Sequence, residues 1–399
     1  MIYLLIGIYL LFLSYYYDFK GHCRRKWFHY GVILLTLILV AGLRYHIGLD
    51  SQRYEARFQT LPKLNQLSIE EFSESAYDPL YLLMASFCRT ISDEFWVLQL
   101  AQAILVNVVF LRFFRKNTKN VFVAILLYYV ILYISNMAET MRESCAISMI
   151  LLGWEYLKSN HKFGFVIFCL FAFLFHSSAI IAIAVCLLVL AGIHEKIRFS
   201  FGTVFGALLI FVMSTVVQNV FSDALTLLAF SSRLSDKIDI YSDTAMFSNT
   251  LNLFGIISVS LLYGFVPYIC AKTLRGTKYS NTLEFFLVIE MFCAAFSFPI
   301  SIFYRYINYF MPFVILAMAK ALSEKSYRIP FIGTLKTSIF TTWLLLSLPF
   351  IIERAKYMFG NDGDSKYKVY SRYYPYSSIL TEDLDPDREN LYYEKLFRY

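Results

Sequence analysis

Charged residues are scarce in this chain: only 16% of its 399 residues are Asp, Glu, Lys or Arg, whereas 58% are hydrophobic. Apolar runs recur along the sequence with brief basic interruptions, which argues against a soluble protein and indicates a polytopic membrane protein. The net charge of +7 does not indicate a nucleic-acid partner. The Lys and Arg residues lie between apolar runs, where the positive-inside rule already accounts for them.

Cysteine pairs, repeats and cofactor motifs are also lacking. The seven cysteines are scattered, mostly within apolar runs, without the spacing of a zinc site or a disulfide framework. The sequence shows no internal repeat, no phosphate-binding loop and no acidic cluster suited to a metal, so we expect no metal and no other cofactor. The first apolar run, residues 2–17, lacks a preceding basic segment and a small-residue cleavage site, and it is predicted to be an uncleaved signal anchor.

The basic clusters predict how the chain is oriented in the membrane. Lys and Arg near the ends of spans favour the cytoplasmic side. The strongest candidates for cytoplasmic loops are the basic segments 20–26, 112–120, 158–162, 194–198, 272–278 and 324–328. Neighbouring segments must be joined by two crossings, so we expect an all-α fold of about twelve transmembrane helices with both termini outside.

This topology implies one transmembrane domain, residues 1–352, with outer loops at 44–78 and 222–248. Residues 353–399 are predicted to form an extracytoplasmic tail. Its segment 383–394 spaces carboxylates as a calcium-binding loop does, but Arg388 stands where such a loop needs glycine, so this segment is predicted to be acidic and solvated. The tyrosines of this tail are expected to pack on the outer loops or to form an aromatic belt at the membrane interface.

Two apolar intervals need interpretation before the spans can be counted. Residues 163–193 look like one over-long run, but a break at "FHSS" gives two short helices whose shared turn carries His176 near the outer face. Between residues 28 and 111, three apolar segments are present where two crossings are allowed. The shortest, 79–91, is interrupted by Arg89, and we predict that it lies in the outer interface or forms a re-entrant element.

The predicted topology places several ionisable side chains on the outer face: Arg44, His46, Asp50, Arg53, Arg142, His176 and Arg305. Arginine is disfavoured there, and its burial in the membrane costs about 2.5 to 3.5 kcal/mol. Each arginine could reach lipid phosphates or pair with a neighbour such as Glu143. Alternatively, guanidinium groups grip phosphate oxygens in a bidentate fork, so three converging arginines would suit a pyrophosphate.

Two further residues on this face have a structural and a chemical interpretation. His176 could be a capping or interfacial residue, or its imidazole could deprotonate a sugar hydroxyl. Asp50 could cap the helix that follows it, or it could be a second candidate base facing the arginines.

Four motifs together resemble the EpsG family of Wzy-type polysaccharide polymerases, which make O-antigen, exopolysaccharide or capsule. They are "AGLRYHIGLDSQRY" (41–54), "MRESCAIS" (141–148), "FHSSAI" (175–180) and "FYRYINYF" (303–310), and their order covers the chain from 41 to about 320. The resemblance implies a multi-span, metal-independent glycosyltransferase of the GT-C class. It would polymerise lipid-linked oligosaccharide repeat units at the outer face of the cytoplasmic membrane.

The resemblance also implies roles for individual residues. The positions that match are Arg44, Gly48, Asp50, Tyr54, Arg142, His176 and Arg305. Arg44, Arg142 and Arg305 would bind the pyrophosphate of an undecaprenyl-linked donor, and His176 or Asp50 would be the base for the acceptor. Arg53, Tyr54, Glu143 and Tyr304 are further candidates. Glu143 departs from the family pattern, which often has Gln there, and a chain-length regulator and a flippase are candidate partners.

Two other functions remain open. A lipid-linked oligosaccharide flippase would carry charges deep within its spans and show two related halves, whereas here the charges gather at one face. A membrane acyltransferase acting on glycans could also use a histidine base.

Overall fold

The computed structural model describes residues 1–75, 77–214, 216–217, 219–220, 260–277, 279–300, 303–322, 327–329, 333–335, 339–363 and 365–396. The predicted outer loop 222–248 lies outside these residues. The chain forms two compact units: the first comprises residues 1–187 and 339–399, and the second comprises residues 188–338. The described residues are mostly helical, as predicted, and they include a short antiparallel hairpin of β1 (Tyr327–Ile329) and β2 (Gly333–Leu335).

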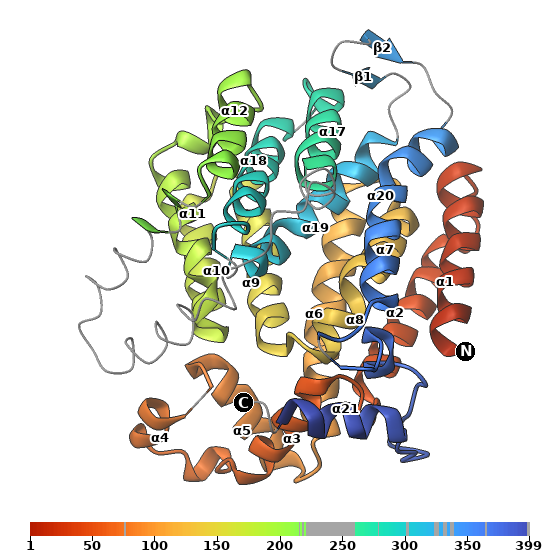
Figure 1. The fold of residues 1–399 in the computed structure, drawn as a ribbon, viewed down its shortest axis with the longest axis vertical. Coiled ribbons are helices and arrows are strands. Elements are labelled where there is room, and N and C mark those ends of the chain that lie inside the picture. Colours follow the sequence, from red (N-terminus) through yellow and green to blue (C-terminus); the bar gives the residue numbers. More distant parts are fainter. Residues whose placement is uncertain are drawn as a thin grey trace. The chain divides into compact units, whose positions relative to one another are not determined.

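The first unit is a bundle of apolar helices (Figure 1). They are α1 (Ile2–Leu13), α2 (Lys26–Gly42), α6 (Trp96–Asn117), α7 (Val121–Tyr128), α8 (Ile134–Ala138), α9 (Met141–Lys158), α10 (Lys162–Phe175), α11 (Ile180–Leu190) and α20 (Ile339–Phe359). Helix α6 packs against α2 and α9, and α9 packs along α10. The apolar side chains of α7 and α9 are buried nearly all round, which places these helices inside the bundle.

Three described helical segments are long and apolar enough to cross a membrane: Ile2–Phe19, Trp96–Asn117 and Val121–Ala138. Shorter apolar helices are Lys26–Gly42, Pro79–Ile91, Lys162–Phe175, Ser177–Leu190 and Phe201–Val212. These segments agree with a membrane protein. The count of about twelve spans, the GT-C architecture and the single transmembrane domain stay predictions.

Shorter helices lie at one end of the first unit (Figure 1). They are α3 (Leu49–Thr60), α4 (Ile69–Glu74), α5 (Pro79–Ile91) and α21 (Pro386–Leu396). Helix α5 has the bounds predicted for segment 79–91, because Pro79 is pre-set for the first helical position. The predicted break at "FHSS" is also confirmed: α10 ends at Phe175, and a short 3₁₀ turn, Ser177–Ala179, leads into α11.

The C-terminal tail packs on the segment after α2, whereas its segment 383–394, which was predicted to be solvated, is exposed or half-buried except at Arg388 and Leu391. Its backbone bonds to the segment after α2: Tyr45 N donates to Ser377 O at 3.0 Å, and Gly48 N donates to Arg372 O at 2.9 Å. Tyr373 is buried in a small apolar cluster with Ile47. The tail packs because its tyrosines cover apolar surface on the outer segments, as was expected of these side chains.

The second unit contains α12 (Phe201–Val212), α17 (Val266–Leu274), α18 (Ser280–Phe296) and α19 (Phe303–Ala321). Helix α18 packs along α19 and also contacts α12 and α17. A π-helical segment, η6 (Ser260–Phe265), leads into α17. Ser200 begins α12 with a capping box, in which its side chain accepts from Thr203 N.

Candidate functional site

The start of α3 fixes the first wall of the candidate site. Gly48 has φ +88°, and a Cβ there would lie 2.7 Å from the Cβ and carbonyl oxygen of Ala138, so only glycine fits. The first amides of α3 are capped by Glu139, whose carboxylate accepts from Leu49 N at 3.3 Å and from Asp50 N at 3.4 Å. The interpretation of Asp50 as the cap is therefore wrong, and Asp50 stands in the first turn of α3.

A cavity of about 160 Å³ opens beside α3. It is lined by Asp50, Arg53, Tyr54, Arg57 and Arg142. Arg53 Nη1 lies 3.8 Å from Asp50 Oδ1. Three arginines and one aspartate line the cavity, and Arg142 also pairs with Asp78, so a formal excess of one positive charge remains, which favours an anionic ligand.

Aromatic side chains hold Arg142 at this cavity. Arg142 stands in the first turn of α9, and its Nε donates to the Tyr54 hydroxyl at 3.2 Å. Its guanidinium lies over the rings of Tyr54 and Tyr77, 5.9 and 5.6 Å from their centroids. Tyr77 in turn donates from its hydroxyl to the Tyr54 carbonyl at 3.4 Å. The planar guanidinium is thus oriented before any ligand arrives.

Asp78 connects Arg142 to His176. Its Oδ2 lies 3.1 Å from His176 Nδ1 and 3.5 Å from Arg142 Nη1. Burial by itself would raise the pKa of Asp78, but the hydrogen bond and charge of His176 and the charge of Arg142 hold that pKa below its usual value. An ionised Asp78 favours the tautomer of His176 that carries its proton on Nδ1.

Sequence reasoning missed Asp78, Tyr77 and Arg57. The one available signal was the position of Asp78, directly before the proline that begins α5. Asp is common at such helix starts, so the pattern predicts a cap and gives no reason to expect a contact with His176.

Arg44 does not line this cavity. Its side chain is buried, with Nη2 donating to the sulfur of Met141 at 3.4 Å and Nη1 donating to the carbonyl of Ala41. Burial lowers the pKa of Arg44 to about 10, so it keeps its charge at neutral pH. It borders a much smaller void shared with Tyr3 and Tyr133.

The remaining predicted residues have separate surroundings. His46 lies between two carboxylates, with Nδ1 3.1 Å from Glu389 and Nε2 3.5 Å from Glu55. Glu143 is buried in the first turn of α9. Tyr304 and Arg305 stand in the first turn of α19 in the second unit, and both are exposed. Convergence of Arg305 with Arg142 stays a prediction.

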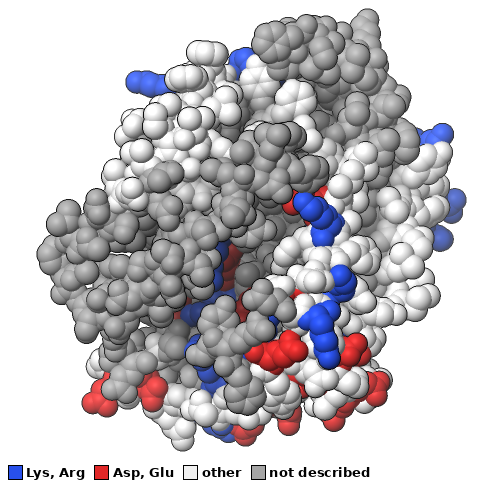
Figure 2. Space-filling model, in the orientation of Figure 1, with Lys and Arg blue, Asp and Glu red and all other residues white. Residues whose placement is uncertain are grey.

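Charge gathers at the end of the first unit that carries the cavity. Figure 2 shows acidic and basic side chains together at the lower end of the view, where Figure 1 places α3, α4 and α21. Lys and Arg side chains also appear elsewhere in this view, so this end is distinguished mainly by its acidic side chains.

Comparison with protein families gave one match: the chain fits the EpsG family over residues 27–378. That range includes the four motifs described above. Comparisons with curated proteins and with solved structures gave no match.

Proposed function

Because the chain belongs to the EpsG family, a family of polysaccharide polymerase-like membrane proteins, we propose that it polymerises a bacterial surface polysaccharide. The donor would be a growing glycan on undecaprenyl pyrophosphate, and the acceptor a hydroxyl of one lipid-linked repeat unit. The reaction would take place at the outer face of the cytoplasmic membrane. A flippase that delivers repeat units and a chain-length regulator would be its partners.

One observation carries this proposal: the Asp78 carboxylate contacts both an imidazole and a guanidinium. His176 Nδ1 lies 3.1 Å from Asp78 Oδ2, and Arg142 Nη1 lies 3.5 Å from the same oxygen. Arg142 also lines the positively charged cavity. A glycosyl transfer from a pyrophosphate needs these two elements, a base for the acceptor and positive charge for the leaving group.

In the proposed reaction, Asp78 holds His176 by Nδ1, and Nε2 accepts the proton of the acceptor hydroxyl. The acceptor oxygen then forms a bond with the anomeric carbon of the donor. The bond between that carbon and the pyrophosphate oxygen breaks, and its electron pair leaves on undecaprenyl pyrophosphate. Arg53, Arg57 and Arg142 stabilise the charge that develops there. Asp50, which lines the same cavity, is the alternative base.

The decisive experiment supplies lipid-linked repeat units to the purified protein in vesicles and measures the length of the glycans. We expect a ladder of products from the parent and none from His176→Ala. His161→Ala is a matched control, because His161 stands at the opposite end of α10 from His176.

Three outcomes would contradict the proposal. Transport of repeat units without elongation would favour the flippase, and acyl transfer to the glycan would favour the acyltransferase. A normal ladder from His176→Ala, with Asp50→Asn inactive, would move the role of base to Asp50.

A further inference from the structure

The second unit contains an apolar groove of about 470 Å³. Helices α12, α17 and α18 and the segment η6 form its walls. Most of its lining is aromatic or aliphatic, including Phe201, Phe211, Tyr263 and Phe265. A groove of this size and composition can hold a substantial apolar group.

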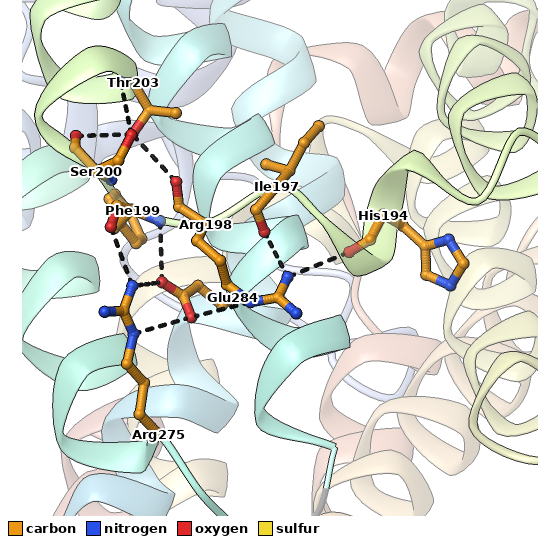
Figure 3. Close-up of polar contacts among 8 residues, drawn as sticks. All are labelled: His194, Ile197, Arg198, Phe199, Ser200, Thr203, Arg275 and Glu284. Carbon is orange, nitrogen blue, oxygen red and sulfur yellow. Dashed lines mark hydrogen bonds and ion pairs between the residues drawn. The ribbon is translucent and has the colours of Figure 1, made fainter.

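Ionic contacts build one end of this groove (Figure 3). Phe199, a lining residue, donates from its N–H to Glu284 Oε1 at 2.9 Å and accepts at its carbonyl from Arg275 Nη2 at 3.0 Å. Glu284 is 1% exposed and pairs with Arg275 at 2.5 Å. The Phe199 ring meets Tyr268 edge to face at 5.6 Å. Phe199, which forms the end wall, is therefore held both at its N–H and at its carbonyl oxygen.

The same end carries an excess of positive charge. Lys272 lines the groove, and its Nζ lies 5.4 Å from the centroid of the Tyr268 ring. Arg198 Nε lies 3.8 Å from Glu284, which already pairs with Arg275. Arg198 and Arg275 thus share the one carboxylate of Glu284, so basic groups outnumber acidic ones in these contacts, which favours an anion nearby. Ser200, the N-cap of α12, also lines the groove. The positive end of the α12 dipole therefore lies at this end of the groove.

We propose that the groove binds an acyl chain of an anionic membrane phospholipid, with the lipid phosphate at Lys272. Helix α12 exposes large apolar side chains along the groove, with Phe201 86% and Leu208 50% exposed, as suits a surface in contact with lipid. The basic segments 194–198 and 272–278 flank the charged end and are predicted to be cytoplasmic. Anionic lipid headgroups are attracted to such segments. This site is independent of the proposed pyrophosphate site, which is predicted to face outward.

The experiment measures lipid retention by native mass spectrometry of the full-length protein. The probes are phosphatidylglycerol and phosphatidylcholine with identical acyl chains. We expect the parent to prefer phosphatidylglycerol. Lys272→Gln should weaken phosphatidylglycerol binding about five-fold and leave phosphatidylcholine unchanged, because one lysine contact with an anionic lipid is lost. Lys162→Gln, in the first unit, is the charge-matched control.

A second pair of variants tests the acyl chain. Leu208 lines the groove and Leu209 does not, although they are neighbours on α12 and are 50% and 45% exposed. Leu208→Trp should therefore reduce binding of both lipids about ten-fold, and Leu209→Trp should not, because only the first fills the groove. Equal binding by the two tryptophan variants would overturn the proposal. So would displacement of phosphatidylglycerol by undecaprenyl phosphate, which would assign the groove to the lipid-linked substrate.

Discussion

Arg142 contacts groups from two other parts of the chain, α3 and the segment before α5, so the shape of its side chain is as important as its charge. It contacts Tyr54 through Nε, Asp78 through Nη1 and the Tyr77 ring through its face. Lysine would keep the charge but could not make these contacts together. We expect Arg142→Lys to reduce polymerisation at least about ten-fold, with a near-normal protein level in the membrane.

The measurement for Arg142→Lys is the glycan ladder from membranes with matched expression. Arg115→Lys is the control, since Arg115 lies at the far end of α6, over the rings of Trp27 and Tyr30. A ladder of parental length from Arg142→Lys would mean that Arg142 only anchors the protein.

The sequence indicated some residues of the candidate cavity, but not all of them and not their contacts. The motifs selected Asp50, Arg53, Tyr54 and Arg142, and the structure brings these four around one cavity. They did not predict that Glu139 caps α3 in place of Asp50. The motifs identify candidate polar residues. The partner of a buried polar group, however, depends on packing between segments far apart in the sequence.

At the scale of elements, apolar runs and proline predicted the helices well. Composition did not predict how the tail packs on the rest of the first unit. Segment 79–91 and the break at His176 follow from a helix-starting proline and a polar interruption. Segment 383–394 is rich in charge, which suggested solvent exposure, and most of its residues are exposed or half-buried. Arg388 is nevertheless buried, with its guanidinium donating to backbone carbonyls of His46 and Pro375. Composition does not reveal that such charges meet backbone acceptors.

The docked tail contains an acid-sensitive contact at Asp362. Its carboxylate bonds to Arg372 at 2.5 and 2.7 Å and to Lys395 at 3.0 Å. Burial alone would raise the pKa of Asp362, but Arg372 and Lys395 hold it below the usual value. A lowered folded-state pKa stabilises the docked tail above the unfolded pKa of about 3.9, and this stabilisation is lost as pH falls through the folded value.

We therefore expect the tail to stay docked from neutral pH down to about pH 4, to lose stability as pH falls further, and to be released below the folded-state pKa of Asp362. Asp362→Asn should release it already at pH 7, because the ion pairs are absent at every pH. The measurement is cleavage of the tail by a protease in detergent, with Asp387→Asn, at an exposed position of α21, as the control. Equal protection of the Asp362→Asn tail and the parental tail at pH 7 would refute the role of these ion pairs.

At the scale of the whole molecule, the predicted orientation rests on basic loops and can be tested at the "FHSS" turn. Ser177 is exposed at the start of the turn between α10 and α11. In a background without the native cysteines, Ser177→Cys should react with a membrane-impermeant thiol reagent applied from outside. A cysteine in place of Ser159, exposed after α9 in a predicted cytoplasmic loop, should not react. The reverse pattern would overturn the orientation.

At the scale of the whole molecule, the prediction that Arg142 and Arg305 bind the same pyrophosphate can be tested with a double-mutant cycle. If both guanidiniums bind one pyrophosphate, their replacement by lysine should not be additive, because the first substitution already loosens the ligand that the second arginine holds. We expect the double variant to elongate glycans faster than the product of the two single effects predicts, with a coupling of about 0.5 to 3 kcal/mol. The measurement is kcat/KM for lipid-linked repeat units.

Arg198→Lys replaces Arg305→Lys in the control cycle, because Arg198 pairs with Glu284 near the lipid groove and should combine additively with Arg142→Lys. Additivity in both cycles would separate Arg305 from the site and leave Arg53, Arg57 and Arg142 as the pyrophosphate ligands.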